Sequence, residues 1–238
     1  LLKCFSDTRM FENCTPILYG SSKVASYHKK LINATDFPFI NIRTVEQAEA
    51  SKFNILNIIQ DEVKIDIGQP TEIGGRLAAM SLDYACHDLM NGKLDALVTN
   101  PINKKNIQSE KFNFPGHTEY LTNKFGVEES LMIMTCHDLH IGIMTNHLSL
   151  SQVPKVLNRE LILRKLQVMD SSLKRDFGIR MPKIAVLALN PHAGDRGLIG
   201  TEDDSIVAPA IREAFDNGIL AFGPYPADGF FGNGTFRE

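Results

Sequence analysis

The sequence has no excess of basic residues and no long apolar run, and each absence excludes a class of protein. Its 238 residues carry a net charge of −3 without a basic cluster, which argues against a nucleic-acid partner. No apolar segment approaches the roughly 20 residues that span a bilayer, so we expect no membrane attachment. The first ten residues also lack the basic-then-apolar order of a signal peptide.

Cysteine is scarce, and no two cysteines form a C-x-x-C pair. The four residues Cys4, Cys14, Cys86 and Cys136 are scattered along the chain. Such spacing is typical of reduced thiols, so we expect a cytoplasmic protein. The chain also lacks an initiator methionine, which predicts that its true N-terminus lies upstream of Leu1.

Short apolar runs alternate with amphipathic segments along the sequence. Strands are predicted at 15–20, 94–101, 131–136 and 183–191; helices are predicted at 21–31 behind a serine cap, around 78–89, around 162–173 behind Asn158, and at 201–218 behind a T-x-x-D capping box formed by Thr201 and Asp204. This alternation predicts an α/β protein with a largely parallel sheet. The closely spaced runs within 131–147 predict an antiparallel hairpin.

Polar residues recur where the predicted strands end. Asn100-Pro101 is followed by Lys104, a second strand ends at Asn146-His147, and a third ends at Asn190-Pro191-His192. Ligands of open α/β sheets bind beyond the carboxyl ends of the strands, so these groups indicate a candidate site. Lys104 is a candidate for binding an anion because it closely follows a strand end.

His192 has three possible roles on sequence grounds. It could be a hydrogen-bonded structural residue, a metal ligand or a general base. His147 occupies a matching position after another strand, and two such imidazoles could share a divalent ion. His137 and His140 are predicted in the hairpin turn and are interpreted as a solvated tip. Neither the structural nor the metal-binding role is excluded by the spacing alone.

The glycine pair Gly74-Gly75 precedes a predicted helix without the spacing of a phosphate-binding loop. We therefore interpret it as a turn. No residue is identified by the sequence as the general base.

Four segments together resemble the 4-hydroxythreonine-4-phosphate dehydrogenase family of pyridoxal phosphate biosynthesis. They are FPGHTEYL (114–121), TNHLSL (145–150), LALNPHAGDRGLIGTED (187–203) and GPYPAD (223–228), and the resemblance covers nearly the whole chain. It implies the isocitrate/isopropylmalate dehydrogenase-like fold, with a mixed, largely parallel sheet, helices on both faces, and two subdomains around a cleft. It also implies a homodimer with a shared active site, NAD or NADP, and one divalent metal ion (Zn, Mg or Co).

The resemblance further implies roles for individual residues. His147 and His192 match metal ligands, and His117 with Thr118 matches substrate contacts. Asp228 matches an acidic residue beside the site, and we take it with Lys104 as a candidate for proton handling and anion positioning. The implied reaction is metal-assisted oxidation of 4-phosphohydroxy-L-threonine at C3, followed by decarboxylation to 3-amino-2-oxopropyl phosphate.

The chain departs from the family pattern at both ends. The family's Gly-Asp-Pro-rich opening motif is absent, and a third metal histidine would follow Glu238 in a Tyr-His-Asp-Gln-Gly segment. We therefore expect residues 1–238 to be a single α/β catalytic unit, an internal portion of a longer chain missing both termini. Two alternatives stay open: a dehydrogenase of 4-phospho-erythronate or 4-phospho-threonate, and a metallohydrolase.

Overall fold

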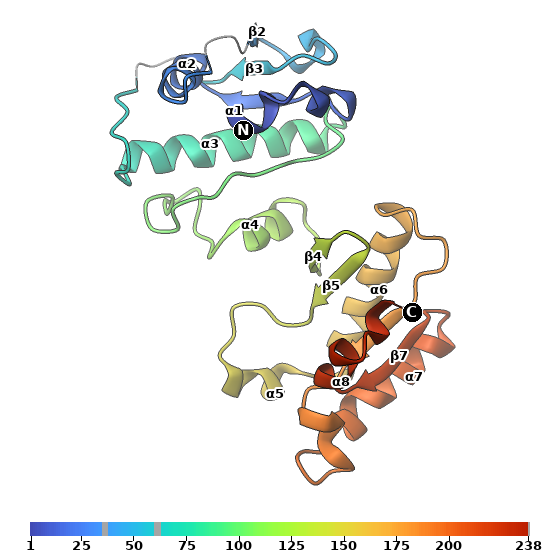
Figure 1. Cartoon of the computed structure of the whole chain (residues 1–238). Helices are drawn as coiled ribbons and strands as arrows, with labels where there is room; N and C mark the ends of the chain where they lie inside the picture. Colours follow the sequence, from blue (N-terminus) through green and yellow to red (C-terminus); the bar gives the residue numbers. More distant parts are fainter. Residues whose placement is uncertain (35–37, 60–62, 238) are drawn as a thin grey trace. The chain divides into compact units, whose positions relative to one another are not determined.

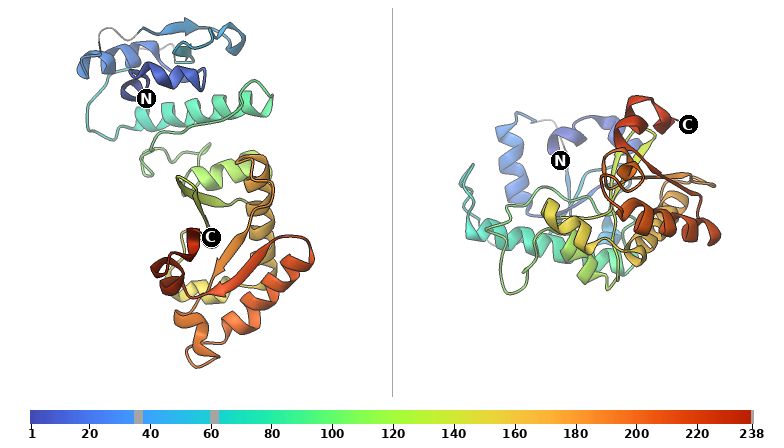
Figure 2. Two further views of the ribbon diagram at one scale, coloured as in Figure 1. Left: turned by 45° about the vertical axis from the view of Figure 1, so that its right-hand side comes forward. Right: turned by 90° about the horizontal axis from the view of Figure 1, so that it is seen from below.

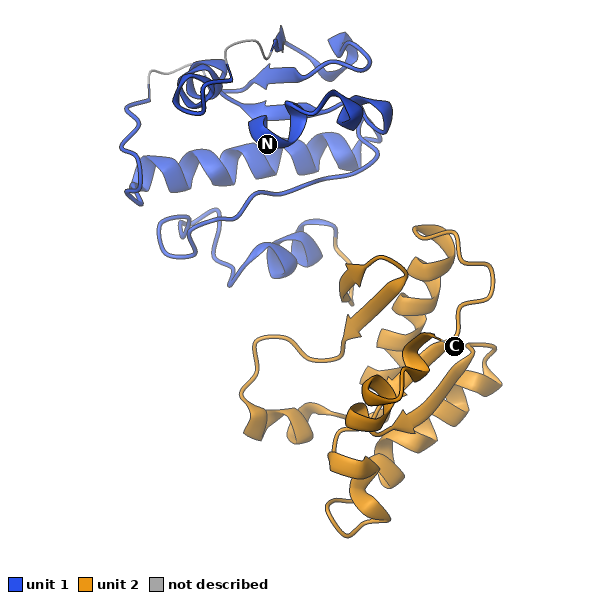
Figure 3. Cartoon of the chain, viewed as in Figure 1, with its two compact units in different colours: residues 1–125 blue, residues 126–238 orange. Residues whose placement is uncertain are grey.

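The chain forms two compact units, Leu1–Phe125 and Gly126–Glu238, each with its own core (Figure 3). A computed structural model describes residues 1–34, 38–59 and 63–237. The course of the chain through both units can be followed by colour in Figure 1. Within the described residues, no helix is both long enough and apolar enough to cross a membrane.

Unit 1 contains a three-stranded parallel sheet with the order β1-β3-β2. Its elements are α1 (Leu2–Phe5), a 3-10 turn (Thr8–Glu12), β1 (Ile17–Gly20), α2 (Ser22–Leu31), β2 (Ile40–Ile42), a second 3-10 turn (Val45–Gln47), β3 (Asn54–Asn57), α3 (Glu72–Met90) and α4 (His117–Lys124).

The central strand β3 buries side chains on both faces of this sheet. Ile55 packs with Phe5 of α1 and Ala25 of α2. Its neighbour Leu56 packs with Ala85 of α3 on the other face. Successive strand residues point to opposite faces, so an unbroken apolar run identifies a strand covered on both sides. The predicted α/β layering is thereby confirmed for this unit.

The predicted helix start at Ser21 is confirmed. Its hydroxyl accepts a hydrogen bond from the Val24 backbone N–H at 3.4 Å, which satisfies one of the free amide groups at the start of α2.

Unit 2 contains one antiparallel and one parallel pair of strands. Its elements are β4 (Met132–Cys136), β5 (Leu139–Ile143), a 3-10 turn (Leu150–Gln152), α5 (Val153–Val156), α6 (Arg159–Arg175), β6 (Ile184–Leu187), a 3-10 turn (Pro191–Asp195), a π-helical turn (Asp203–Val207), α7 (Ala208–Asp216), β7 (Ala221–Tyr225), α8 (Ala227–Gly232) and a last 3-10 turn (Thr235–Arg237).

The core of unit 2 lies between its long helices and the parallel pair β6–β7. Ile162 and Leu166 of α6, Ala210 of α7 and Ala221 of β7 are buried there. Figure 2 shows α6 and α7 beside these strands. The predicted Asn158 cap is confirmed, because its side chain accepts from the Leu161 N–H at 2.8 Å. The predicted hairpin is confirmed as β4 and β5.

The prediction of a strand at 94–101 is wrong. None of these residues is in a strand, and within the described residues no strand pairs with them. Leu97 packs against the core of unit 1, whereas Val98 is 84% exposed. An apolar run becomes a strand only beside a partner that accepts its backbone hydrogen bonds.

Three smaller predictions are also corrected. Gly74 and Gly75 lie inside the first turns of α3 rather than in a separate turn. His140 lies within β5, with its ring centroid 4.2 Å from that of Phe177, so only His137 belongs to the hairpin turn. The helical segment after Thr201 begins with a π-helical turn that has no side-chain cap, so the predicted capping box is wrong.

Candidate functional site

The turn that follows β6 has an unusual backbone. His192, Ala193, Asp195 and Arg196 all have positive φ angles, between 44° and 56°, and Gly194 between them has φ 79°. The left-handed region costs a non-glycine residue about 1–2 kcal/mol, so several such residues together need support from their surroundings. Strain of this kind concentrates at functional sites, which marks the turn as a candidate.

Hydrogen bonds and close contacts hold the turn in this conformation. The buried Asp203 carboxylate accepts from the Leu189 N–H at 2.7 Å and from the Asn190 N–H at 2.9 Å. The Asn190 side-chain amide donates to Glu202 Oε2 at 3.0 Å. A Cβ added at Gly194 would lie 2.6 Å from the Gly200 carbonyl oxygen, so only glycine allows this approach.

His192 extends from this turn toward Asp228 in α8. Its Nδ1 lies 3.7 Å from Asp228 Oδ2, and the two side chains are 66% and 67% exposed. At this separation the pair interacts by charge when the imidazole is protonated. Because Nδ1 faces the carboxylate, Nε2 points away from it on the other side of the imidazole ring. The structure therefore brings together two of the predicted site residues.

His147 lies four residues beyond the end of β5, where its side chain is exposed. It also has a positive φ, of 54°, the same value as His192. Both predicted metal ligands thus follow strands of unit 2 and occupy the left-handed region. Among the described residues, no three or more His, Cys, Asp or Glu side chains are clustered so that they could hold a metal ion.

The donor chemistry of these residues fits a divalent metal. A ligating histidine commonly places a carboxylate at its other ring nitrogen, which orients the ring and raises its basicity. Asp228 lies on the Nδ1 side of His192, but at 3.7 Å the two side chains interact by charge and do not form a hydrogen bond. Two imidazoles are fewer protein ligands than a zinc site normally has, so a complete metal site would need further ligands.

His117 and Thr118 are the first two residues of α4 in unit 1. Partial burial lowers the pKa of His117 below its ordinary value, so the neutral imidazole is favoured at pH 7. The helix is anchored by Tyr120, whose hydroxyl donates to Asp83 at 3.1 Å and whose ring stacks on Phe112. A neutral His117 can donate a hydrogen bond from one ring nitrogen and accept one at the other.

Lys104 lies in an exposed turn of unit 1. The Gln108 side chain ties this turn to the segment before α4, because its Nε2 donates to the Lys104 carbonyl at 3.1 Å and to the Phe114 carbonyl at 2.9 Å. The candidate anion ligand and the segment that leads to His117 are therefore connected within one unit.

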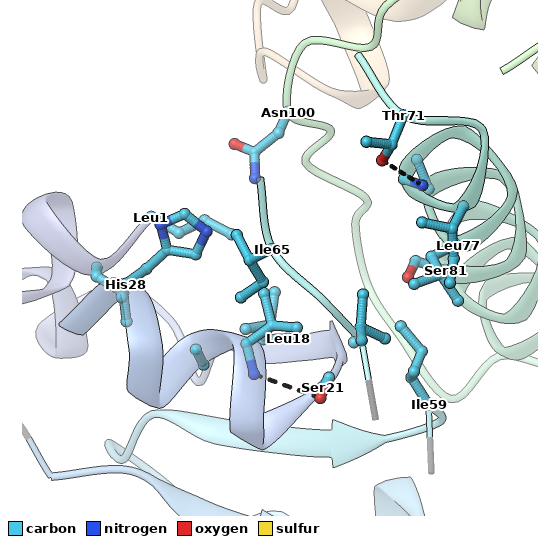
Figure 4. Close-up of a pocket in the computed structure, with 18 of the residues that line it drawn as sticks. Leu1, Leu18, Ser21, His28, Ile59, Ile65, Thr71, Leu77, Ser81 and Asn100 are labelled. Carbon is cyan, nitrogen blue, oxygen red and sulfur yellow. Dashed lines mark hydrogen bonds between the residues drawn. The ribbon is translucent and has the colours of Figure 1, made fainter. Parts of the chain in front are cut away.

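Unit 1 also contains a hollow of about 600 Å³ near the carboxyl ends of β1 and β3 (Figure 4). Its lining is mostly apolar, and two of its hydroxyl groups already accept hydrogen bonds from helix N-termini: Ser21 from Val24 and Thr71 from Gly74. None of the six predicted site residues lines it. The hollow is therefore not the predicted site.

Fold and site together define an α/β protein of the isocitrate dehydrogenase-like class, with histidines presented after strands. A crystal structure of a 4-hydroxythreonine-4-phosphate dehydrogenase from Burkholderia phymatum superimposes with a TM-score of 0.84 at 26% identity, covering 98% of this chain and 71% of that one. The predicted fold class is thereby confirmed.

The chain belongs to the PdxA family. Residues 12–238 match the family described as "Pyridoxal phosphate biosynthetic protein PdxA". The 4-hydroxythreonine-4-phosphate dehydrogenase of Bacteroides thetaiotaomicron is 44% identical over 240 residues, which include all of this chain and 65% of that protein. A Clostridium botulinum protein, whose name proposes a D-threonate 4-phosphate dehydrogenase, is 31% identical over 97% of this chain and 70% of its own length.

The family resemblance inferred from the sequence is therefore confirmed. The chain spans 65% of the length of the Bacteroides relative. One residue of the site, Asp203, is not predicted from the sequence; it is fully buried and accepts two backbone hydrogen bonds. Its only signal in the sequence is the acidic run Glu202-Asp203-Asp204, which does not reveal which carboxylate is buried.

Proposed function

We propose that the protein is an NAD(P)-dependent, metal-assisted dehydrogenase that oxidises 4-phosphohydroxy-L-threonine at C3 and then releases CO2. The observation that carries this proposal is the strained turn that presents His192 beside Asp228. The names of the relatives support a phosphorylated hydroxy acid as the substrate. They also favour a dehydrogenase over a metallohydrolase.

In this mechanism, His147 and His192 are the residues that would hold one divalent ion (Zn, Mg or Co). The ion would supply Lewis-acid polarisation of the substrate's C3 oxygen, and NAD or NADP would supply the acceptor for the hydride from C3. Asp228, 3.7 Å from His192 Nδ1, is our candidate for proton handling. The cofactor is inferred from the family, and we assign no described residue to its binding.

Residues of unit 1 bind the substrate in this proposal. His117 and Thr118 contact it from the start of α4, and Lys104 binds one of its anionic groups. Oxidation at C3 leaves a carbonyl β to the carboxylate. The C1–C2 bond then breaks, its electrons pass toward the C3 carbonyl, and a proton is added at C2. CO2 and 3-amino-2-oxopropyl phosphate are the products.

We expect the full-length protein with a divalent metal to reduce NAD or NADP fastest with 4-phosphohydroxy-L-threonine. D-threonate 4-phosphate and 4-phospho-D-erythronate should give a lower kcat/KM. The measurement is the initial rate of cofactor reduction across the three substrates. A preference for D-threonate 4-phosphate would move the assignment to the activity named for the Clostridium relative. No reduction with any of the three would leave a hydrolase as the alternative.

We also propose a homodimer in the cytoplasm, with an active site shared between subunits. The exposed methionines of β4 support an interface there, because Met132 is 37% and Met134 is 62% exposed. The four cysteines are free thiols, which supports a reducing compartment. Sedimentation of the full-length protein should show a dimer at micromolar concentration, and an active monomer would contradict this.

A further inference from the structure

Asp203 is a buried carboxylate whose two oxygens are both engaged by the backbone. Oδ1 accepts from the Leu189 N–H at 2.7 Å, and Oδ2 accepts from the Asn190 N–H at 2.9 Å. The residue has 0% exposure. A carboxylate so completely removed from water remains in a fold only when hydrogen bonds compensate for the lost hydration.

The two amides lie where the chain leaves the sheet. The last backbone bond from this segment to β7 is the one that the Ala188 N–H donates to the Tyr225 carbonyl, at 2.8 Å. The next two N–H groups no longer face β7, and Asp203 accepts both of them. The carboxylate thus replaces the neighbouring strand as the hydrogen-bond partner at this point.

The residues after Asn190 depend on this attachment. His192 has φ 54° and ψ 28°, and the left-handed conformation continues through Ala193 and Gly194. A free chain would leave this region, since it is unfavourable for residues with a Cβ. The direction in which the His192 side chain projects is therefore set by how firmly residues 189 and 190 are held.

We propose that Asp203 is a positioning residue: it fixes the end of β6 so that His192 is held in the orientation needed to bind the divalent ion. This inference rests on the proposed function, because it assigns His192 to the metal. Asp203 does not act as a ligand, since both of its oxygens face backbone amides. Its effect reaches the metal only through the turn.

The neighbouring acids provide a comparison within the same segment. Glu202 is half-buried and accepts a hydrogen bond from the Asn190 side chain at 3.0 Å. Asp204 is exposed. Asp203→Asn and Asp204→Asn make the same change of charge and shape one residue apart. Only Asp203→Asn puts an amide NH2, which is a donor, opposite a backbone N–H that needs an acceptor.

The test is a Co2+ titration of the metal-free, full-length protein, followed by absorption. Asp203→Asn should bind Co2+ about 10–100-fold more weakly than the wild type, as is usual when a group that supports a ligand is changed. Asp204→Asn should bind like the wild type. Hydrogen exchange in the metal-free protein should be faster at residues 189–196 in Asp203→Asn alone.

The folded state of the variant has to be checked first, because a loss of structure would also weaken metal binding. Circular dichroism must show Asp203→Asn folded at the temperature of the titration. Equal Co2+ affinity in folded Asp203→Asn and the wild type would overturn this inference and leave the proposed function intact. A wild-type protein that binds no Co2+ would overturn the metal site itself, and this inference with it.

If Asp203→Asn does not fold, Glu202→Ala gives a second route to the same turn. It removes the bond from the Asn190 side chain and leaves the Asp203 carboxylate in place. Co2+ affinity should then fall by a few-fold, with faster exchange at 189–196. An unchanged affinity together with unchanged exchange would contradict the proposal.

Discussion

Replacing His192 with alanine is expected to abolish most of the activity of the full-length enzyme. The change removes one imidazole from the proposed metal site, and the polarisation of the C3 oxygen is lost with the metal. Because Lewis-acid stabilisation contributes several kcal/mol, kcat/KM should fall about a hundredfold or more. His147→Ala should behave in the same way. The measurements are initial rates and metal content by elemental analysis.

His137→Ala is the matched control for metal content. His137 is also an exposed histidine of unit 2 with a positive φ, of 51°, but it lies in the turn of the hairpin. The control shows whether metal content falls when any exposed histidine with a left-handed backbone conformation is replaced. Full retention of metal in both His147→Ala and His192→Ala would refute the assignment of the ligands.

Gly75→Ala is expected to destabilise the protein, although alanine normally favours a helix over glycine by about 1 kcal/mol. A Cβ at this position would lie 1.9 Å from the backbone oxygen of Asn106, which is too close for two non-bonded heavy atoms. The turn that contains Lys104 would have to move away from α3. We expect a loss of about 2–4 kcal/mol of unfolding free energy, within the range for overpacking and for loss of buried hydrogen bonds.

Gly74→Ala provides the control in the same helical turn. Its Cβ would meet only the Thr71 hydroxyl, at 3.1 Å, and this side chain can adjust. Its unfolding free energy should stay within about 1 kcal/mol of the wild type. Urea unfolding followed by circular dichroism measures both variants. Equal stability of Gly75→Ala and Gly74→Ala would show that α3 and the turn at 103–107 do not pack as described.

The local parts of this structure could be predicted from sequence because their signals are local. Ser21 and Asn158 start helices through hydrogen bonds within three residues of the chain. The apolar run at 183–191 contains the buried strand β6, and the two runs at 131–147 form the hairpin. The strand-end position of His192 is predictable for the same reason, since a strand followed by Asn-Pro-His is a pattern within a short window of sequence.

The remaining features depend on contacts between distant segments. The run 94–101 has the composition of a strand, but strand formation requires a partner that no local pattern supplies. The capping pattern drew attention to Asp204, whereas the carboxylate that matters in the fold is its neighbour Asp203. Gly75 looked like part of a turn because its contact with Asn106 lies 31 residues further along the chain.

The most direct test of the account is the ratio of CO2 released to cofactor reduced. The full-length enzyme would be given 4-phosphohydroxy-L-threonine, NAD or NADP and a divalent metal, and both products would be measured in the same reaction. The proposed mechanism predicts one CO2 for each reduced cofactor, with both lost together when a chelator removes the metal. Cofactor reduction without CO2, or turnover unaffected by the chelator, would contradict it.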